Sequence, residues 1–249
     1  MRLFMEITSL TNAKVKTWMK YHQKKYRDKD QCFLVEGEHL IQEAIEADAL
    51  KVLLLKKESK NIFAWQGECY YVSEEIMKKL SMNVSQISCI GVCHKKSDVF
   101  SNDANRILLL DDVQDPGNLG TLVRSAYSFG FDAIFASKNS VDLYNDKVIR
   151  STQGALFHIP YFQMEMKDAI SLLKKNDFSI YATALKNAKP LSSFSTTDKK
   201  IAIVLGNEGN GVHSSIIDEC DTSIKIEMKR FESLNVAVAG GICMYYFRK

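Results

Sequence analysis

An arginine stands one turn inside a helix that is expected to follow a glycine turn. The segment DPGNLGTLVRSAYSFG occupies residues 115–130, directly after the apolar run of residues 107–110. A glycine turn between a strand and a helix commonly binds a nucleotide phosphate on free backbone N–H groups. Arg124 needs a separate chemical explanation, because such a phosphate site requires no arginine at this position.

Two further loops carry glycines and polar side chains. The segment N-E-G-N-G follows the apolar run IAIVLG and contains Glu208. The segment K-R-F-E-S-L-N follows the run SIKIEM and contains Ser233 and Asn235. In an open parallel sheet, ligands bind beyond the carboxyl ends of the strands. The three loops are therefore the best candidates for one functional site.

The spacing of the glycines argues against two common nucleotide sites. A Rossmann fold needs G-x-G-x-x-G at its first strand-to-helix turn, whereas this turn offers only Gly117 and Gly120. The loop at residues 206–211 spaces its glycines differently, and Glu208 within it would repel a phosphate. No G-K-[ST] tripeptide occurs, which argues against a P-loop.

Taken together and in order, the three loops resemble the motifs of the SpoU branch of the SPOUT superfamily. That family has an asparagine with an arginine six residues later, then L-G-x-E-x-x-G after a strand, then S-L-N opening an apolar helix. The matching residues here are Asn118, Arg124, Leu205, Gly206, Glu208, Gly211, Ser233, Leu234 and Asn235. The resemblance covers residues 106–249. It implies an S-adenosylmethionine-dependent RNA ribose 2′-O-methyltransferase, with a mostly parallel α/β sheet and a deep C-terminal trefoil knot.

The resemblance also implies a role for each matching residue. The cofactor would be bound by the backbone and apolar walls of the knot, at Leu205, Gly206, Ile226, Met228 and Leu234. One departure affects this loop: where the family commonly has I-P-M, this chain has Glu227 between Ile226 and Met228. A looser or altered cofactor loop is therefore expected. The basic pair Lys229 and Arg230 that follows is a second candidate RNA contact.

Catalysis would rest on five polar residues. Asn118 would position Arg124 or the ribose, with a turn or N-cap role as the alternative. Glu208 would orient Arg124 or its own loop by a charge-assisted hydrogen bond. Ser233 and Asn235 would bind substrate or brace the site, although Ser233 also suits an N-cap of the last helix.

Arg124 has two possible roles in the transfer of a methyl group to a ribose hydroxyl. The family's usual proposal makes this arginine the base that removes the hydroxyl proton. A guanidinium normally keeps its own proton, so that role requires a strong local perturbation. Alternatively, the cation lowers the pKa of the hydroxyl and holds the adjacent phosphate while water takes the proton.

The positive charge of the chain is concentrated at its N-terminal end. Residues 1–30 hold eight basic and three acidic residues, although the whole chain has a net charge of only +3. Lys16, Lys20 and Lys24 recur every four residues and would line one face of a helix over residues 11–26, beside Trp18 and Tyr21. Such a face could follow an RNA backbone, and a solvated helix is the alternative.

The spacing of apolar residues indicates two domains. Alternating short helices and strands fill residues 1–98 and resemble the L30e-like substrate-binding domain of the family, with F-L-V-E-G as its first strand. Residues 99–105 are expected to be a linker. Residues 106–249 alternate five buried strands with helices near 119–129, 146–152, 167–175, 212–219 and 234–247, which favours a mostly parallel sheet.

Composition bears on where the protein is located and on whether it contains disulfides or a metal site. No run approaches 18 apolar residues and no secretion signal stands at the start, so a cytoplasmic protein is expected. The six cysteines form no C-x-x-C pair, and neither a disulfide nor a metal site is expected. The resemblance implies a homodimer that modifies RNA, with ribosomal RNA favoured. Transfer RNA methylation, or a non-catalytic RNA-binding role in ribosome assembly, are the alternatives.

Overall fold

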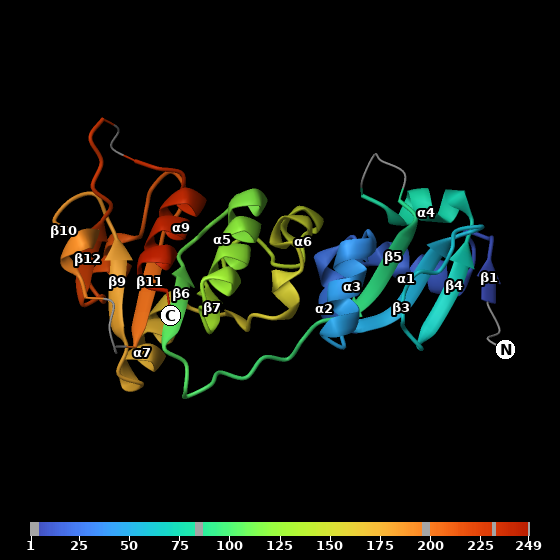
Figure 1. Ribbon diagram of the computed structural model, residues 1–249, viewed down its shortest axis with the longest axis horizontal. Helices are drawn as coiled ribbons and strands as arrows, with labels where there is room; N and C mark the ends of the chain where they lie inside the picture. The colour runs from blue at the N-terminus through green and yellow to red at the C-terminus, as the bar shows by residue number, and fades with distance from the viewer. Residues whose placement is uncertain (1–4, 83–86, 196–199, 231–232, 249) are drawn as a thin grey trace. The chain divides into compact units, whose positions relative to one another are not determined.

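The computed structural model describes residues 5–82, 87–195, 200–230 and 233–248 (Figure 1). The chain forms two compact units. The first comprises Met1–Ser97 together with Tyr144–Phe157, and the second comprises Asp98–Leu143 together with His158–Lys249. The chain thus enters the second unit, returns to the first for fourteen residues, and then completes the second.

The first unit is built on a five-stranded mixed sheet with the order β1-β4-β3-β5-β2. β1, β4 and β3 run parallel, and β5 lies antiparallel between β3 and β2. Its strands are β1 (Met5–Ile7), β2 (Cys32–Glu36), β3 (Leu50–Lys56), β4 (Glu68–Val72) and β5 (Cys89–His94). Its helices are α1 (Ala13–Lys20), α2 (Lys24–Asp30), α3 (Glu38–Glu46), α4 (Glu74–Leu80), α6 (Asp146–Thr152) and the 3₁₀ turn η1 (Ala155–Phe157).

The single helix expected over residues 11–26 is wrong, because the chain breaks between α1 and α2. Nη1 of the buried Arg27 donates hydrogen bonds to the carbonyl oxygens of Tyr21 (2.9 Å) and His22 (3.0 Å), which satisfies the acceptors freed by the break. Lys24 therefore begins a second helix and does not share a face with Lys16. Trp18 and Tyr21 belong to the core and are not surface residues.

The returning segment packs inside the first unit through aromatic rings. Phe33 of β2 lies 4.7 Å from Tyr144 and 6.0 Å from Phe157, measured between ring centroids. The Nε2 atom of His39 on α3 lies 3.1 Å from the Gln153 carbonyl oxygen. Nothing in the local sequence pattern distinguishes this segment from its neighbours in the second unit.

The second unit is built on a seven-stranded sheet with the order β10-β12-β9-β11-β6-β7-β8. Every pairing in this sheet is parallel, which confirms the predicted mostly parallel α/β fold. Its strands are β6 (Arg106–Leu110), β7 (Ala133–Ala136), β8 (Tyr161–Gln163), β9 (Ser179–Thr183), β10 (Lys189–Pro190), β11 (Ile201–Leu205) and β12 (Thr222–Lys225). Its helices are α5 (Pro116–Ser128), α7 (Met166–Lys175), α8 (Ser214–Ile217), α9 (Val236–Tyr246) and the 3₁₀ turn η2 (Leu191–Ser193).

The two faces of the central strands are both buried, as their apolar sequences require. Ile107 and Leu109 of β6 share a core cluster with Ile170 and Leu173 of α7 on one face. On the other face, α5 and α9 lie side by side (Figure 1). Gly240 of α9 makes this approach possible, because a Cβ there would lie 2.4 Å from a methyl group of Leu122 and 2.6 Å from one of Leu205.

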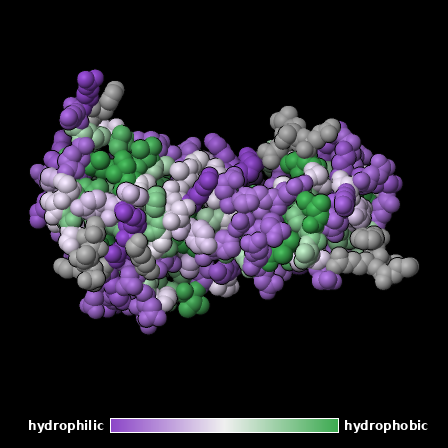
Figure 2. Space-filling view, viewed as in Figure 1, coloured by the Kyte–Doolittle hydropathy of each residue, from purple (hydrophilic) through white to green (hydrophobic). Residues whose placement is uncertain are grey.

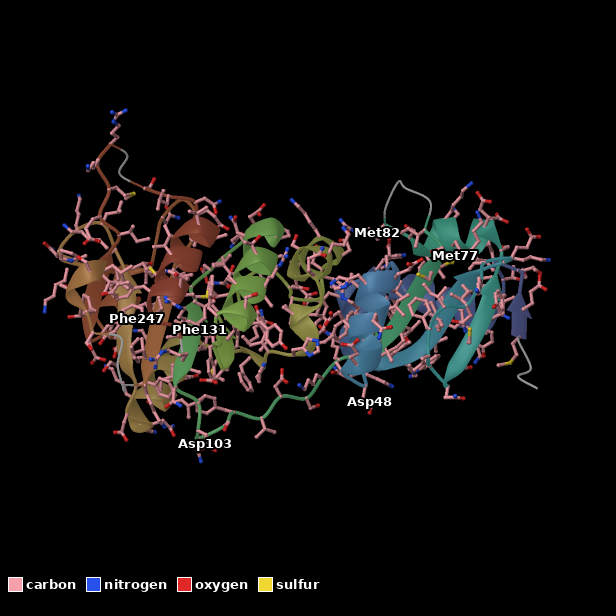
Figure 3. The ribbon with its side chains drawn as sticks, in the orientation of Figure 1. Asp48, Met77, Met82, Asp103, Phe131 and Phe247 are labelled. Carbon is pink, nitrogen blue, oxygen red and sulfur yellow. The ribbon has the colours of Figure 1, made fainter. Side chains whose placement is uncertain are left out.

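A buried arginine joins the start of β6 to the end of α9. Arg106 is 6% exposed, and its Nε donates to the carbonyl oxygen of Phe247 at 2.6 Å. Burial lowers the pKa of Arg106, and the charge of Asp132 offsets part of that effect. Phe247, labelled in Figure 3, is fully buried, so this bond fixes the C-terminal end of α9 in the core.

Replacing Arg106 with leucine should lower the free energy of unfolding by about 2 kcal/mol, because the buried Phe247 carbonyl loses its donor. Denaturation by urea measures this. The matched control is Lys174→Leu, which removes an exposed pair with Glu219 at 3.9 Å and should change stability by less than about 0.5 kcal/mol. Equal losses in the two variants would contradict the structural role of Arg106.

Candidate functional site

The three candidate loops leave the same edge of the second sheet. They follow β6, β11 and β12, and all three strands are parallel. Leu110 at the end of β6 pairs with Leu205 at the end of β11, so the first two loops begin side by side. β12 is separated from β11 only by β9.

Glu208 joins the loop after β11 to the loop after β6. Its carboxylate accepts hydrogen bonds from the backbone N–H groups of Gln114 (3.3 Å) and Asp115 (3.0 Å), and from Nδ2 of Asn118 (3.0 Å). Burial by itself would raise the pKa of Glu208, but the bonds from Asn118 and the backbone outweigh it and lower the pKa. The group is therefore a carboxylate at neutral pH, and it holds the loop.

Asn118 connects this pair to the third motif. Its Oδ1 accepts a hydrogen bond from Nδ2 of Asn235 at 3.0 Å. Asn235 also caps α9, because its Oδ1 accepts from the N–H groups of Ala237 (2.9 Å) and Val238 (3.3 Å). The structure therefore brings Asn118, Glu208 and Asn235 into one chain of contacts.

The N-cap alternatives for Asn118 and Ser233 are wrong. Asp115 caps α5, with Oδ1 accepting from the Asn118 N–H at 2.9 Å, and Asn235 caps α9. Pro116 is the first residue of α5 and Asp115 directly precedes it. An aspartate followed by a proline is a recognisable N-cap signal in a sequence, but the family motif does not include it. Ser233 is exposed next to Asn235.

Arg124 lies on the exposed side of α5, away from this chain of contacts. It lies six positions after Asn118, which places the two side chains about 120° apart around the helix. Within the described ranges, its guanidinium makes no hydrogen bond or ion pair. The expected contact between Glu208 and Arg124 is therefore absent there, and Glu208 holds its loop instead.

The loop at residues 206–211 is a tight turn held by Asn207, which sequence reasoning missed. The backbones of Asn207 and Gly211 exchange two hydrogen bonds of 3.0 and 2.9 Å. The Asn207 side chain accepts from the N–H groups of Gly209 and Asn210 and donates to the Asp112 carbonyl oxygen at 3.0 Å. Gly206 is required here, because its Cβ would lie 2.1 Å from backbone atoms of Gly211 and Val212.

The candidate cofactor residues supply apolar surface and backbone groups. Ile226 and Met228 are half-buried, and Leu234 is 39% exposed. Leu205 is 1% exposed, so its backbone rather than its side chain is available. Residues 205–211 include no cation. This set fits an adenosine, which needs apolar walls and backbone hydrogen bonds, better than a phosphate.

Glu227, which replaces the family's usual proline, has a defined partner. Its carboxylate accepts a hydrogen bond from the Ser192 hydroxyl of η2. The parallel pairing of β10 with β12, in which Pro190 lies opposite Lys225, brings these two residues together. The bond from Ser192 and backbone bonds lower the pKa of Glu227. Arg230 is exposed beyond this loop, and Phe231 and Glu232 lie outside the described residues.

The described residues contain no group of three or more His, Cys, Asp or Glu side chains placed to hold a metal ion. In the same residues, no helix has the length and apolar character needed to cross a membrane.

Comparison with protein families gives two matches. The model described as the SpoU rRNA Methylase family matches residues 105–245, and that of the MRM3-like substrate binding domain matches residues 12–86. The first match spans more than half of the chain. The chain belongs to the SpoU rRNA methylase family. Membership confirms the predicted RNA methyltransferase activity and S-adenosylmethionine as the cofactor.

Full-length relatives agree with this assignment. The 23S rRNA (guanosine(2553)-2'-O)-methyltransferase RlmP of Bacillus subtilis is 36% identical over 98% of this chain and 99% of its own length. The AdoMet-bound rRNA methyltransferase of Sinorhizobium meliloti matches with a TM-score of 0.87 and 26% identity, over 98% of this chain and 97% of its own. An RNA 2'-O ribose methyltransferase matches with a TM-score of 0.83 and 26% identity, over 98% of both chains.

Gly206→Ala should weaken S-adenosylmethionine binding at least about tenfold, because the added Cβ forces the loop backbone to move. Isothermal titration calorimetry measures this. Gly209→Ala is the matched control in the same loop, since its Cβ would meet only Oδ1 of Asn207, at 3.5 Å. Equal effects of the two substitutions would show that crowding at Gly206 is not the cause.

Proposed function

We propose that this SpoU-family enzyme transfers a methyl group from S-adenosylmethionine to a ribose 2′-hydroxyl in 23S rRNA, and that it works in the cytoplasm. The observation that carries the proposal is the contact chain Glu208–Asn118–Asn235, which unites one residue from each family motif at one sheet edge. The full-length similarity to a 23S rRNA guanosine methyltransferase favours a guanosine as the target.

Bound S-adenosylmethionine supplies an electrophilic methyl group on a sulfonium. In the proposed site, the backbone of Leu205 and Gly206 and the side chains of Ile226, Met228 and Leu234 hold the cofactor. The loops after β11 and β12, which carry them, would form the trefoil knot. The contacts among Glu208, Asn118 and Asn235 join the loop after β11 to the start of α5 and to the start of α9. Ser233 is available to the substrate.

Arg124 contributes an exposed cation to this arrangement. With no partner among the described residues, its guanidinium is available for a phosphate beside the target ribose. We favour this electrostatic role over that of a base, because no described residue lies within hydrogen-bonding distance of the guanidinium to accept its proton. The 2′-hydroxyl proton would then leave to water as the methyl group arrives.

Arg124→Ala should lower kcat on ribosomal RNA by about a hundredfold or more while leaving S-adenosylmethionine affinity unchanged, because the lost cation acts on the RNA. Steady-state kinetics and calorimetry separate the two effects. Arg124→Lys should keep part of the rate; if it keeps most of it, Arg124 cannot be the base. Lys167→Ala, an exposed cation on α7, is the control.

The target is identified by mapping 2′-O-methyl groups in total RNA from cells with and without the protein. One 23S rRNA site should disappear and return only with the wild-type gene, not with Arg124→Ala. Loss of a transfer RNA site would assign the tRNA alternative. No lost site, together with no binding of S-adenosylmethionine, would leave a non-catalytic assembly role.

We further propose a homodimer that buries the exposed side of α9. Apolar residues gather over this helix in Figure 2. Val238, Ile242 and Tyr245 recur at helical spacing on α9 and are 39–55% exposed. A stripe of this kind is typical of a surface that another chain covers. The family relationship makes a second copy the best candidate partner.

The first unit would bind the RNA through α1 and α2. Lys16, Lys20 and Lys24 are exposed, and none of them has an ion-pair partner among the described residues, whereas Lys14 is paired with Glu68. The Lys20 ammonium lies 5.5 Å from the centre of the Tyr26 ring. Free cations beside an aromatic ring suit a nucleic-acid backbone. Arg230 in the second unit is a further candidate contact.

Lys16→Glu, Lys20→Glu and Lys24→Glu should each weaken RNA binding about threefold to tenfold and reduce its salt dependence, because each would remove a phosphate contact. Filter binding at several salt concentrations measures both quantities. Lys78→Glu on α4 reverses a cation of the same unit that already pairs with Glu74. An equal loss in this control would indicate a general charge effect instead of a contact.

A further inference from the structure

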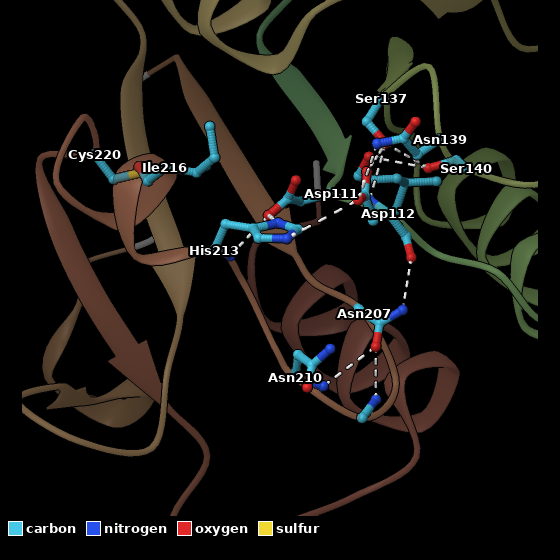
Figure 4. Close-up of polar contacts among 12 residues, drawn as sticks. Asp111, Asp112, Ser137, Asn139, Ser140, Asn207, Asn210, His213, Ile216 and Cys220 are labelled. Carbon is cyan, nitrogen blue, oxygen red and sulfur yellow. Dashed lines mark hydrogen bonds and ion pairs between the residues drawn. The ribbon is translucent and has the colours of Figure 1, made fainter.

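Asp111 is a buried carboxylate, and in the described part of the chain its hydrogen-bond donors both belong to one histidine. It follows β6 directly, and it is 3% exposed. Its backbone N–H donates to the Leu205 carbonyl oxygen at 2.8 Å, which extends the pairing of β6 with β11. Its Oδ2 accepts from both the backbone N–H (2.8 Å) and Nδ1 (2.9 Å) of His213, as Figure 4 shows.

The next residue, Asp112, forms hydrogen bonds with the loops that follow β7 and β11. Its carboxylate accepts from the Ser137 hydroxyl (2.6 Å) and the Asn139 amide (3.3 Å), both beyond β7. Its carbonyl oxygen accepts from Nδ2 of Asn207 at 3.0 Å. The backbone of Asp112 has a φ of 59°, in the left-handed region, so the extended conformation of β6 ends before this residue. The ends of β6, β7 and β11 thus share one polar network (Figure 4).

This network holds the second motif loop at both ends. Asn207 fixes the start of the loop to Asp112, and His213 fixes its end to Asp111. Glu208 lies between these two anchors and reaches the first motif. His213 immediately precedes α8, but its ring makes no capping bond to that helix and is directed back to Asp111.

We propose that His213 is a positioning residue for the cofactor: through Asp111 it fixes the loop at residues 206–212 in the shape that binds S-adenosylmethionine. The proposal rests on the proposed function of this loop. Removing the ring leaves a buried carboxylate with one of its two donors, which favours a rearranged loop. The hydrogen bond that His213 donates to Asp111, and the charge of that carboxylate, also raise the pKa of His213.

The test compares His213→Leu with His213→Asn. Leucine removes the donor, whereas the amide nitrogen of asparagine can take the place of Nδ1. His213→Leu should raise the KM for S-adenosylmethionine about tenfold with kcat changed by less than about twofold, as expected for a lost ground-state interaction with a charged acceptor. His213→Asn should recover most of the affinity. His94→Leu, an exposed histidine at the end of β5, is the control and should bind as the wild type does.

Three results would overturn the proposal: a wild-type KM in His213→Leu, equal losses in the leucine and asparagine variants, or a loss confined to kcat. If the leucine variant does not fold, His213→Ala, which also lacks a side-chain donor, replaces it with the same expectations. If even the wild type binds no S-adenosylmethionine, the proposed function fails. Hydrogen exchange at the Gly209 and Gly211 amides then tests whether His213 holds the loop. Faster exchange in His213→Leu than in the wild type supports this role, and unchanged exchange refutes it.

Discussion

The hydrogen bonds of the Glu208 carboxylate hold the functional site together. A carboxylate that is partly removed from water is costly unless its oxygens are satisfied. Here two backbone N–H groups from the segment between β6 and α5, and one side-chain amide from the first turn of α5, satisfy it. The same bonds that offset the cost of burial also fix the two loops. A salt bridge to Arg124 would have engaged that cation, which the structure leaves available.

The parallel sheet explains why residues from distant parts of the chain meet. β6 ends at Leu110 and β11 ends at Leu205, and these two residues are paired. The loops that follow the two strands therefore begin side by side at the same edge of the sheet. Asn235 is the N-cap of α9, and α9 packs against α5 because Gly240 permits a close approach. The contact between Asn235 and Asn118 is therefore a consequence of helix packing as much as of local sequence.

Sequence reasoning was most successful where the chain repeats a short pattern. Buried strands and motif residues at the ends of strands could be located because apolar runs and glycine turns have strong local signals. It failed where a distant side chain decides the local structure. The break between α1 and α2 depends on Arg27, and the packing of Tyr144 with the first unit depends on Phe33. The contact of Asp111 with His213 spans 102 residues and has no sequence signal.

The third motif loop shows how one constraint can replace another. A proline would stiffen this loop by restricting its own φ angle, whatever its neighbours do. Glu227 instead relies on Ser192, which the pairing of β10 with β12 brings within reach. That neighbour is itself well anchored, since Leu191 is buried and the Phe194 carbonyl oxygen accepts from the Tyr246 hydroxyl at 2.7 Å. The stiffness of the candidate cofactor loop thus depends on the segment that follows β10, a dependence that a proline at this position would not create.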